Sequence, residues 1–106
     1  MDRVIQDGMV AVLISPSFGA GFHTWNDIPN LCFCPYIVNH ILNGTKNEIE
    51  ESEIKKIYNL ADDEWVSTIG LEDVVIEWLP QGTQFTIDEY DGSETILLLS
   101  DIAIIA

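Results

Sequence analysis

The chain has 106 residues, 47% of them apolar, and 18 acidic against 4 basic side chains, which gives a formal net charge of -14. This length and apolar content predict one compact domain over 1–106 and exclude a mainly disordered chain. Four cations are too few for direct binding of nucleic acid, because each phosphate contact needs one. No apolar run reaches the ~18 residues of a membrane-spanning helix, and no signal-peptide layout is present, so we expect no membrane contact and a cytoplasmic location.

The first predicted element is a buried strand over 9–14, a short apolar run between a glycine and a Ser-Pro pair. A long loop over 15–34 follows. Its prolines, glycines and asparagines set turns, but it also carries aromatic side chains that a solvated linker would lack. We therefore expect the loop to pack on the body of the domain, where it can line a pocket.

Two short helices come next. The first is predicted over 35–42, since it begins at a proline and ends at an Asn-Gly pair. The second is predicted over about 45–61, because Thr45 and Glu48 have the spacing of a capping box and the apolar residues after them follow a rough helical period.

The period changes to two in the last third of the chain. Alternating strands are predicted over 74–79, 84–88 and 94–99, with a turn at Pro80-Gln81-Gly82 and a hairpin at Asp91-Gly92. We expect an α+β fold: a small antiparallel sheet, made of the N-terminal strand and this C-terminal meander, covered by the two short helices.

The chain ends in an apolar segment, Ile-Ala-Ile-Ile-Ala over 102–106. Such a segment is too apolar to remain in water as an unpaired edge. It is expected to be buried in the core or to pair with a second copy of the chain, and the second alternative predicts a homodimer.

The loop after the first strand contains a Gly-x-Gly sequence whose backbone amides can cradle an anion. It lacks the Gly-Lys-Ser/Thr ending of a nucleotide-binding loop, so turn-forming glycines are the competing interpretation. The aromatic and polar side chains around it are of the kind that line small-molecule pockets. The candidate ligand-binding residues are Ser15, Ser17, Gly19, Gly21, His23, Thr24, Trp25 and Asn26.

Cys32 and Cys34 lie near His23 and His40 and have the residue types of a zinc site. A Cys-x-Cys pair is not the usual zinc knuckle, and a disulfide at this spacing would be strained. We expect buried, reduced thiols and no metal.

Ser15, Ser17, His23 and Asp27 include the residue types of a hydrolytic triad. Side chains so close in sequence rarely converge in triad geometry, and no Gly-x-Ser-x-Gly elbow is present. We therefore expect a protein that is not an enzyme and has no cofactor.

The acidity belongs to the second half of the chain. Residues 1–47 hold three acids against two bases, whereas 48–106 hold 15 acids against two bases. Such an excess is either a solvated face or a row of carboxylates that imitates nucleic-acid phosphates and docks on a basic groove. The candidate partner-binding residues are Glu72, Asp73, Glu77, Trp78, Asp88, Glu89, Asp91 and Glu94.

Three segments, 10–26, 75–85 and 88–94, resemble a family of small, mostly uncharacterised proteins of bacteriophages and prophages. The most specific part is a strand followed by Ser-Pro-x-x-Gly-Ala-Gly-x-x-Thr-Trp-Asn, residues 15–26. The resemblance implies a phage-type setting in a bacterial host cell, where small acidic proteins often inhibit defence nucleases and others sequester nucleotide signals.

Two functions from different classes are therefore expected. The first is a non-enzymatic inhibitor whose acidic second half binds a basic surface of a host or defence protein that handles nucleic acid. The alternative is a binding module that encloses a small ligand, such as a nucleotide, in the loop from Gly19 to Asn26.

Overall fold

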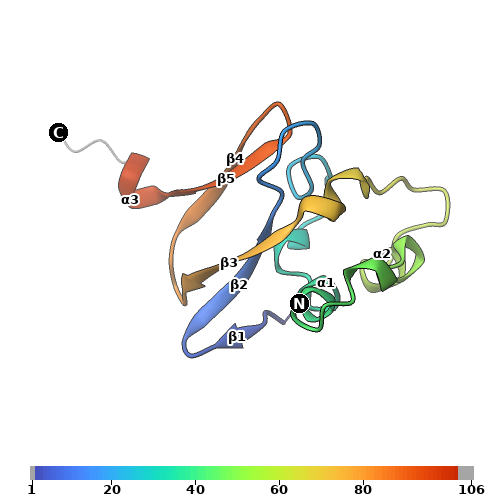
Figure 1. Ribbon diagram of the computed structural model, residues 1–106, viewed down its shortest axis with the longest axis horizontal. Coiled ribbons are helices and arrows are strands. Elements are labelled where there is room, and N and C mark those ends of the chain that lie inside the picture. Colours follow the sequence, from blue (N-terminus) through green and yellow to red (C-terminus); the bar gives the residue numbers. More distant parts are fainter. Residues whose placement is uncertain (1, 103–106) are drawn as a thin grey trace.

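The strand predicted over 9–14 is β2 (Met9–Ile14), the middle strand of a three-stranded antiparallel sheet in the order β1-β2-β3 (Figure 1). The computed structural model describes residues 2–102. β1 (Ile5–Gln6) turns into β2 through Asp7 and Gly8, which both have positive φ. β3 (Val75–Pro80) pairs with β2 along its whole length, with Val12 opposite Glu77.

The last two strands form a sheet of their own. β4 (Phe85–Tyr90) and β5 (Ser93–Leu98) pair as an antiparallel hairpin. The predicted Asp91-Gly92 turn is confirmed: φ is 50° at Asp91 and 87° at Gly92, as a two-residue hairpin turn requires.

The α+β class is confirmed, but the predicted meander is divided between two sheets. β3 does not pair with β4, because the link between them is tied back to the β1–β2 turn: the Gln81 amide donates to the Gly8 carbonyl at 2.9 Å. Thr83 then donates to the Pro80 carbonyl at 3.0 Å, so the chain turns away from β3 instead of folding alongside it. Sequence alternation predicts strands, whereas these long-range bonds decide their partners.

The two faces of β2 are buried in different ways. Ala11 and Leu13 point into the main core, where side chains from the helices such as Ile37 and Ile54 meet them. Val12 and Ile14, on the opposite face, are buried on the side of the β4–β5 hairpin, where Val12 lies near Phe85 and Ile14 near Ile96. Because both faces are covered, the strand is a nearly continuous apolar run.

The helices cover one face of the three-stranded sheet, as predicted. α1 (Pro35–Leu42) has the predicted bounds and is followed by Gly44 with φ of 71°. α2 (Glu51–Ile57) is shorter than predicted. The capping-box prediction is wrong: Thr45 caps no helix, and its hydroxyl lies 2.6 Å from His40 Nδ1.

Short 3-10 turns complete the described fold: η1 (Leu31–Phe33), η2 (Lys46–Glu48) and η3 (Ile69–Asp73). α3 (Leu99–Ile102) follows β5 directly and lies at the end of the molecule farthest from α2 (Figure 1). The C-terminal segment expected to be buried or paired continues from there, and its last four residues lie outside the described residues. Within 2–102, no helix has both the length and the apolar character needed to cross a bilayer.

Candidate functional site

The loop over 15–26 lies between the β4–β5 hairpin and η3, and it is bonded to the hairpin and to the segment just before η3 (Figure 1). On the hairpin side, the Gly19 amide donates to the Asp91 carbonyl at 2.7 Å, and the Ser93 hydroxyl donates to the Pro16 carbonyl at 2.6 Å. Gly92 packs so closely on Ala20 that a Cβ at this position would overlap the Ala20 backbone. The loop therefore packs on the body of the domain, as its aromatic content predicts.

The centre of this contact is the carboxylate of Glu94, which is only 1% exposed. One oxygen accepts from the Ser15 amide at 2.8 Å, and the other accepts from the amide and the hydroxyl of Thr24 at 2.8 and 2.6 Å. The Glu94 amide also donates to the Ser15 carbonyl at 2.7 Å. A buried charge is tolerable when several donors satisfy it. The assignment of Glu94 to a partner-binding surface is therefore wrong, because its carboxylate is inside the molecule.

This arrangement changes the interpretation of the glycine-containing loop. The amides of Ser15, Gly19 and Thr24 could have cradled a phosphate, but each already donates to an acceptor of the protein. The anion held by this loop is the side chain of Glu94. A free nucleotide would have to displace these bonds, so the geometry does not favour the small-ligand alternative.

The second half of the loop is fixed to the segment before η3. The buried side chain of Asn26 donates to the carbonyls of Phe22 and Ser67, at 2.8 and 3.0 Å, and accepts from the Ser67 amide at 2.8 Å. Gly21 and Gly70 meet backbone to backbone, with no room for a Cβ on Gly70. Two further candidate ligand residues, Gly21 and Asn26, thus serve the fold.

Of the other candidate ligand residues, Ser17 and Trp25 are exposed, Thr24 is exposed but its hydroxyl is bound to Glu94, and His23 is half-buried. His23 Nδ1 accepts a hydrogen bond from the Cys32 amide at 3.2 Å, which leaves the proton of the neutral ring on Nε2. Burial lowers the pKa of His23, and the nearby Glu94 carboxylate, which raises it, offsets only part of that effect. The Ser15 hydroxyl donates to the Ala20 carbonyl at 3.0 Å and not to His23.

Cys32 and Cys34 are buried free thiols, as expected. Burial raises the pKa of Cys32 to about 11, which makes it a poor nucleophile at neutral pH. His40 Nδ1 lies 2.6 Å from the Thr45 hydroxyl. In the part of the chain that the structure describes, no group of three or more His, Cys, Asp or Glu side chains could hold a metal ion.

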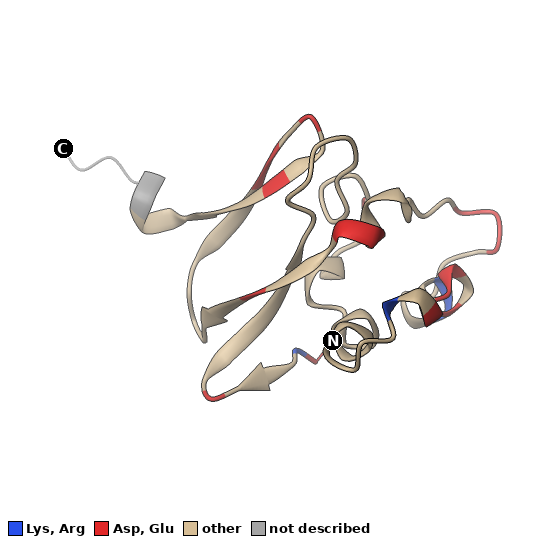
Figure 2. Ribbon diagram, in the orientation of Figure 1, with Lys and Arg blue, Asp and Glu red and all other residues tan. Residues whose placement is uncertain are grey.

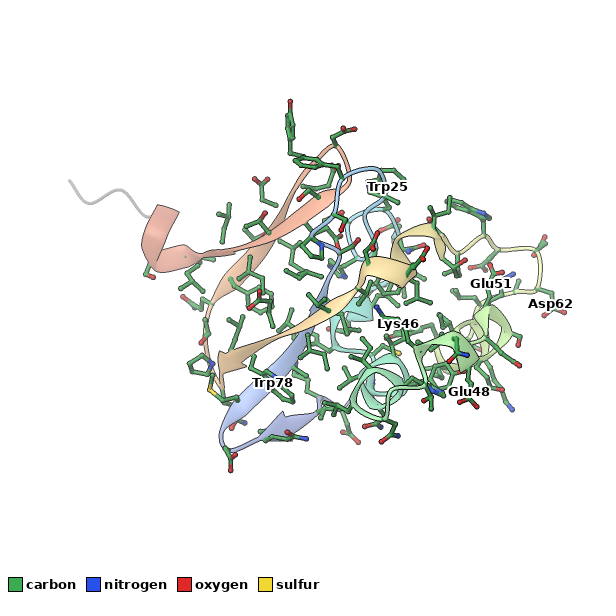
Figure 3. All side chains as sticks on the ribbon, viewed as in Figure 1. Trp25, Lys46, Glu48, Glu51, Asp62 and Trp78 are labelled. Atoms are coloured by element: carbon green, nitrogen blue, oxygen red, sulfur yellow. The ribbon has the colours of Figure 1, made fainter. Side chains whose placement is uncertain are left out.

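The acidic candidates do not all share one surface. Glu77 and Trp78 are neighbours in β3, so their side chains point to opposite faces of the sheet. Glu77 is exposed beside the hairpin, whereas Trp78 packs against the main core. Figure 3 shows Trp78 on the three-stranded sheet and Asp62 at the far end of the molecule. Trp78 is therefore placed as a core residue rather than as an anchor for a partner.

The remaining acidic candidates lie in two exposed groups of acids (Figure 2). One, which we call the acidic segment, is the stretch 62–73, with Asp62, Asp63 and Glu64 in its loop and Glu72 and Asp73 in η3. It also exposes Trp65, by 72% of its surface.

The other group, which we call the hairpin tip, consists of Phe18, Asp88, Glu89, Tyr90 and Asp91. Phe18 and Tyr90 are 70% and 77% exposed, similar to Trp65 in the acidic segment at 72%. Their rings nevertheless contact each other edge to face, with centroids 6.5 Å apart. Three exposed carboxylates therefore belong to the same hairpin end as an aromatic pair that is itself largely exposed. Sequence reasoning missed Phe18, because only the packing of the loop on the hairpin brings it to Tyr90.

Three of the four cations bind groups other than carboxylates. The Lys46 and Lys55 ammonium groups donate to the carbonyls of Glu72 and Asp62, each at 2.8 Å, and the Arg3 guanidinium lies 4.2 Å from the ring centre of Phe33. None of them lies at the hairpin tip. Its three exposed carboxylates therefore present their negative charge to any approaching partner.

Comparisons with family models, with curated proteins and with solved structures gave no match to this chain.

Proposed function

We propose that this protein is a non-enzymatic inhibitor of phage type that binds a basic surface of a host or defence protein that handles nucleic acid. The hairpin tip is the contact. The observation that supports this most is the solvent-exposed Phe18–Tyr90 pair among Asp88, Glu89 and Asp91. Exposed aromatic side chains are typical centres of protein interfaces, and uncompensated charge around them steers a basic partner to the same place.

The position of the tip suits this role. The β4–β5 turn is held by the loop over 15–26 through the Gly19 amide and the Ser93 hydroxyl. Its carboxylates and rings are thus attached to a rigid base, and little conformational entropy is lost when a partner binds. Six of the eight candidate partner residues remain exposed, whereas Glu94 forms the buried attachment and Trp78 belongs to the core.

The test is capture from bacterial lysate by the tagged protein at low and high salt, followed by identification and purification of the bound protein. The tip variant is Asp88→Asn/Glu89→Gln/Asp91→Asn. Asparagine tolerates the positive φ of Asp91, and glutamine keeps the acceptor that Glu89 offers to the Gly92 amide at 2.5 Å. The matched control is Asp62→Asn/Asp63→Asn/Glu64→Gln, which removes the same charge from the acidic segment.

We expect a basic, nucleic-acid-handling protein to be retained at low salt and released at high salt, and excess duplex DNA to compete for it. The tip variant, and separately Phe18→Ala/Tyr90→Ala, should weaken binding by about 10- to 100-fold, while the control variant changes it by less than about threefold. Equal losses in the tip and control variants would show that charge acts only as a general solubilising feature. Retention that needs neither charge nor Tyr90 would rule out the proposal.

A further inference from the structure

A pocket of about 460 Å³ lies toward the end of the three-stranded sheet that holds the β1–β2 turn (Figure 1). Its floor is a row of apolar side chains across the sheet, Ile5 in β1, Val10 in β2 and Leu79 in β3. These residues are paired in register, so their side chains share one face. The link from β3 to β4 closes one side, because the Gln81 amide is bound to the Gly8 carbonyl. The floor is therefore continuous and apolar.

A second wall of the pocket is aromatic. Phe33 of η1 and Phe85 of β4 both line it, and their rings meet edge to face with centroids 6.1 Å apart. Both rings are half-buried, and Ile5 on the floor is 45% exposed, so apolar surface is left open to water inside the pocket. A pocket of this volume, with apolar and aromatic walls and few polar groups, is typical of a site for a small molecule with an apolar body.

The polar group at this pocket is the side chain of Arg3, the only arginine of the chain. Its guanidinium lies 4.2 Å from the ring centre of Phe33, which places the positive charge against the aromatic wall. Among the described residues it forms no ion pair, and its N–H groups donate to no acceptor. A carboxylate can accept two parallel hydrogen bonds from such a guanidinium. The pocket thus combines apolar walls with one unpaired cation.

The charge around the pocket limits the charge of its ligand. Asp2 also borders the pocket, and the chain has a net charge of -14, so every negative charge beyond the one that Arg3 binds is repelled. We propose that the pocket binds small monocarboxylates with an apolar body. The carboxylate binds Arg3, and the body lies on the apolar floor beside the Phe33–Phe85 wall. This inference does not rest on the proposed function, because no residue of the hairpin tip lines the pocket.

The first test compares octanoate with 1-octanol, which has the same alkyl chain without the charge, and with acetate, which has the charge without the chain. Amide chemical shifts of the full chain are followed by NMR at neutral pH. Octanoate is expected to bind with a Kd of about 0.1–1 mM and 1-octanol at least about fivefold more weakly, with no saturable shifts from acetate. The shifts should centre on the amides of Val10, Gly82 and Phe85. Binding of 1-octanol as tight as that of octanoate, tighter binding of octyl phosphate, or shifts centred elsewhere would overturn the proposal.

The second test assigns the charge to Arg3. Arg3→Gln should weaken octanoate binding by about five- to tenfold and change 1-octanol binding by less than about twofold. The matched control is Lys56→Gln, which removes the same charge from an exposed position on α2 outside the pocket and should leave both affinities unchanged. An equal loss for 1-octanol in Arg3→Gln would show that Arg3 only supports the Phe33 wall, and an equal loss of octanoate binding in Lys56→Gln would show that only the net charge matters. Either result would overturn the proposal.

A further variant leaves the contact between Arg3 and Phe33 in place. Asp2→Asn removes the acid that borders the pocket, and it should tighten octanoate binding by about twofold without affecting 1-octanol. Weaker octanoate binding in Asp2→Asn would contradict the placement of the carboxylate at Arg3. Far-ultraviolet circular dichroism of each variant checks that the fold is retained.

Discussion

Glu94 is the residue on which the arrangement of the candidate site depends most. It belongs to β5, yet its carboxylate binds the Ser15 and Thr24 amides from the first quarter of the chain. In the sequence it is one of four acids on the two sides of the Asp-Gly turn, and nothing distinguishes it from Asp88, Glu89 and Asp91, which are exposed. Alternation on β5 together with the position of Ser15 decides that it points inward.

We expect Glu94→Gln to destabilise the fold by about 2–4 kcal/mol, because one acceptor oxygen is replaced by an amide that faces donors. The free energy of unfolding in urea measures this. Glu77→Gln, an exposed substitution of the same kind on β3, is the control and should cost less than about 0.5 kcal/mol. Equal stability of the two variants would contradict the role given to the buried carboxylate.

His23 should make stability depend on pH. Burial lowers its pKa below the ordinary 6.5, so the unfolded chain takes up the proton more readily than the folded one. The stabilisation that the neutral ring contributes is complete above about pH 6.5 and is lost as the pH falls through the folded pKa.

The variant His23→Asn keeps an acceptor for the Cys32 amide but cannot be protonated. Between about pH 7 and pH 5 the wild-type chain should therefore lose more unfolding free energy than the variant, and above pH 7 the two curves should run parallel. Urea denaturation over this pH series measures the difference. Parallel curves at all pH values would mean that His23 is protonated equally in both states.

At the scale of elements, close contacts between glycines hold the loop over 15–26 in place. A Cβ on Gly70 would overlap the Gly21 carbonyl, which is backbone, whereas a Cβ on Gly21 would meet side-chain atoms of Thr24 and Trp25. Gly70→Ala should therefore cost about 1–3 kcal/mol and Gly21→Ala less. Thermal or urea unfolding of both variants tests the order, and the reverse order would show that the two backbones do not meet as described.

The individual strands and α1 follow from local signals: the apolar run of β2, the Pro35 start and the Asp91-Gly92 turn. The division of the five strands between two sheets does not follow from local signals. Three alternating strands in succession predict a meander, yet β3 joins β2 and leaves β4 to pair with β5. The capping-box error has a local origin: the Thr45 hydroxyl can bond either to its own helix start or to His40, five residues earlier, and in the structure it lies 2.6 Å from His40 Nδ1.

At the scale of the whole molecule, the net charge of -14 should make stability depend on salt. The exposed acids repel one another in the folded chain, and the range of this repulsion falls from about 20 Å to about 4 Å between 20 mM and 0.5 M salt. We expect the urea midpoint to rise over this range in NaCl. The variant Asp62→Asn/Asp63→Asn/Glu64→Gln should show a smaller rise, and identical salt dependence of the two proteins would contradict the expectation.

The sequence alone determined what depends on local pattern and on totals: the α+β class, most elements, the hairpin turn and the concentration of acid in the second half. Tertiary structure alone decided which residues meet. In the tertiary structure, the Glu94 carboxylate points inward and is bound by the glycine-containing loop. Trp78 packs against the core, and Phe18 contacts Tyr90, more than 70 residues later in the chain. The physical reason is that periodicity specifies which side of its own element a side chain occupies, whereas the partner on that side depends on bonds between distant backbone groups.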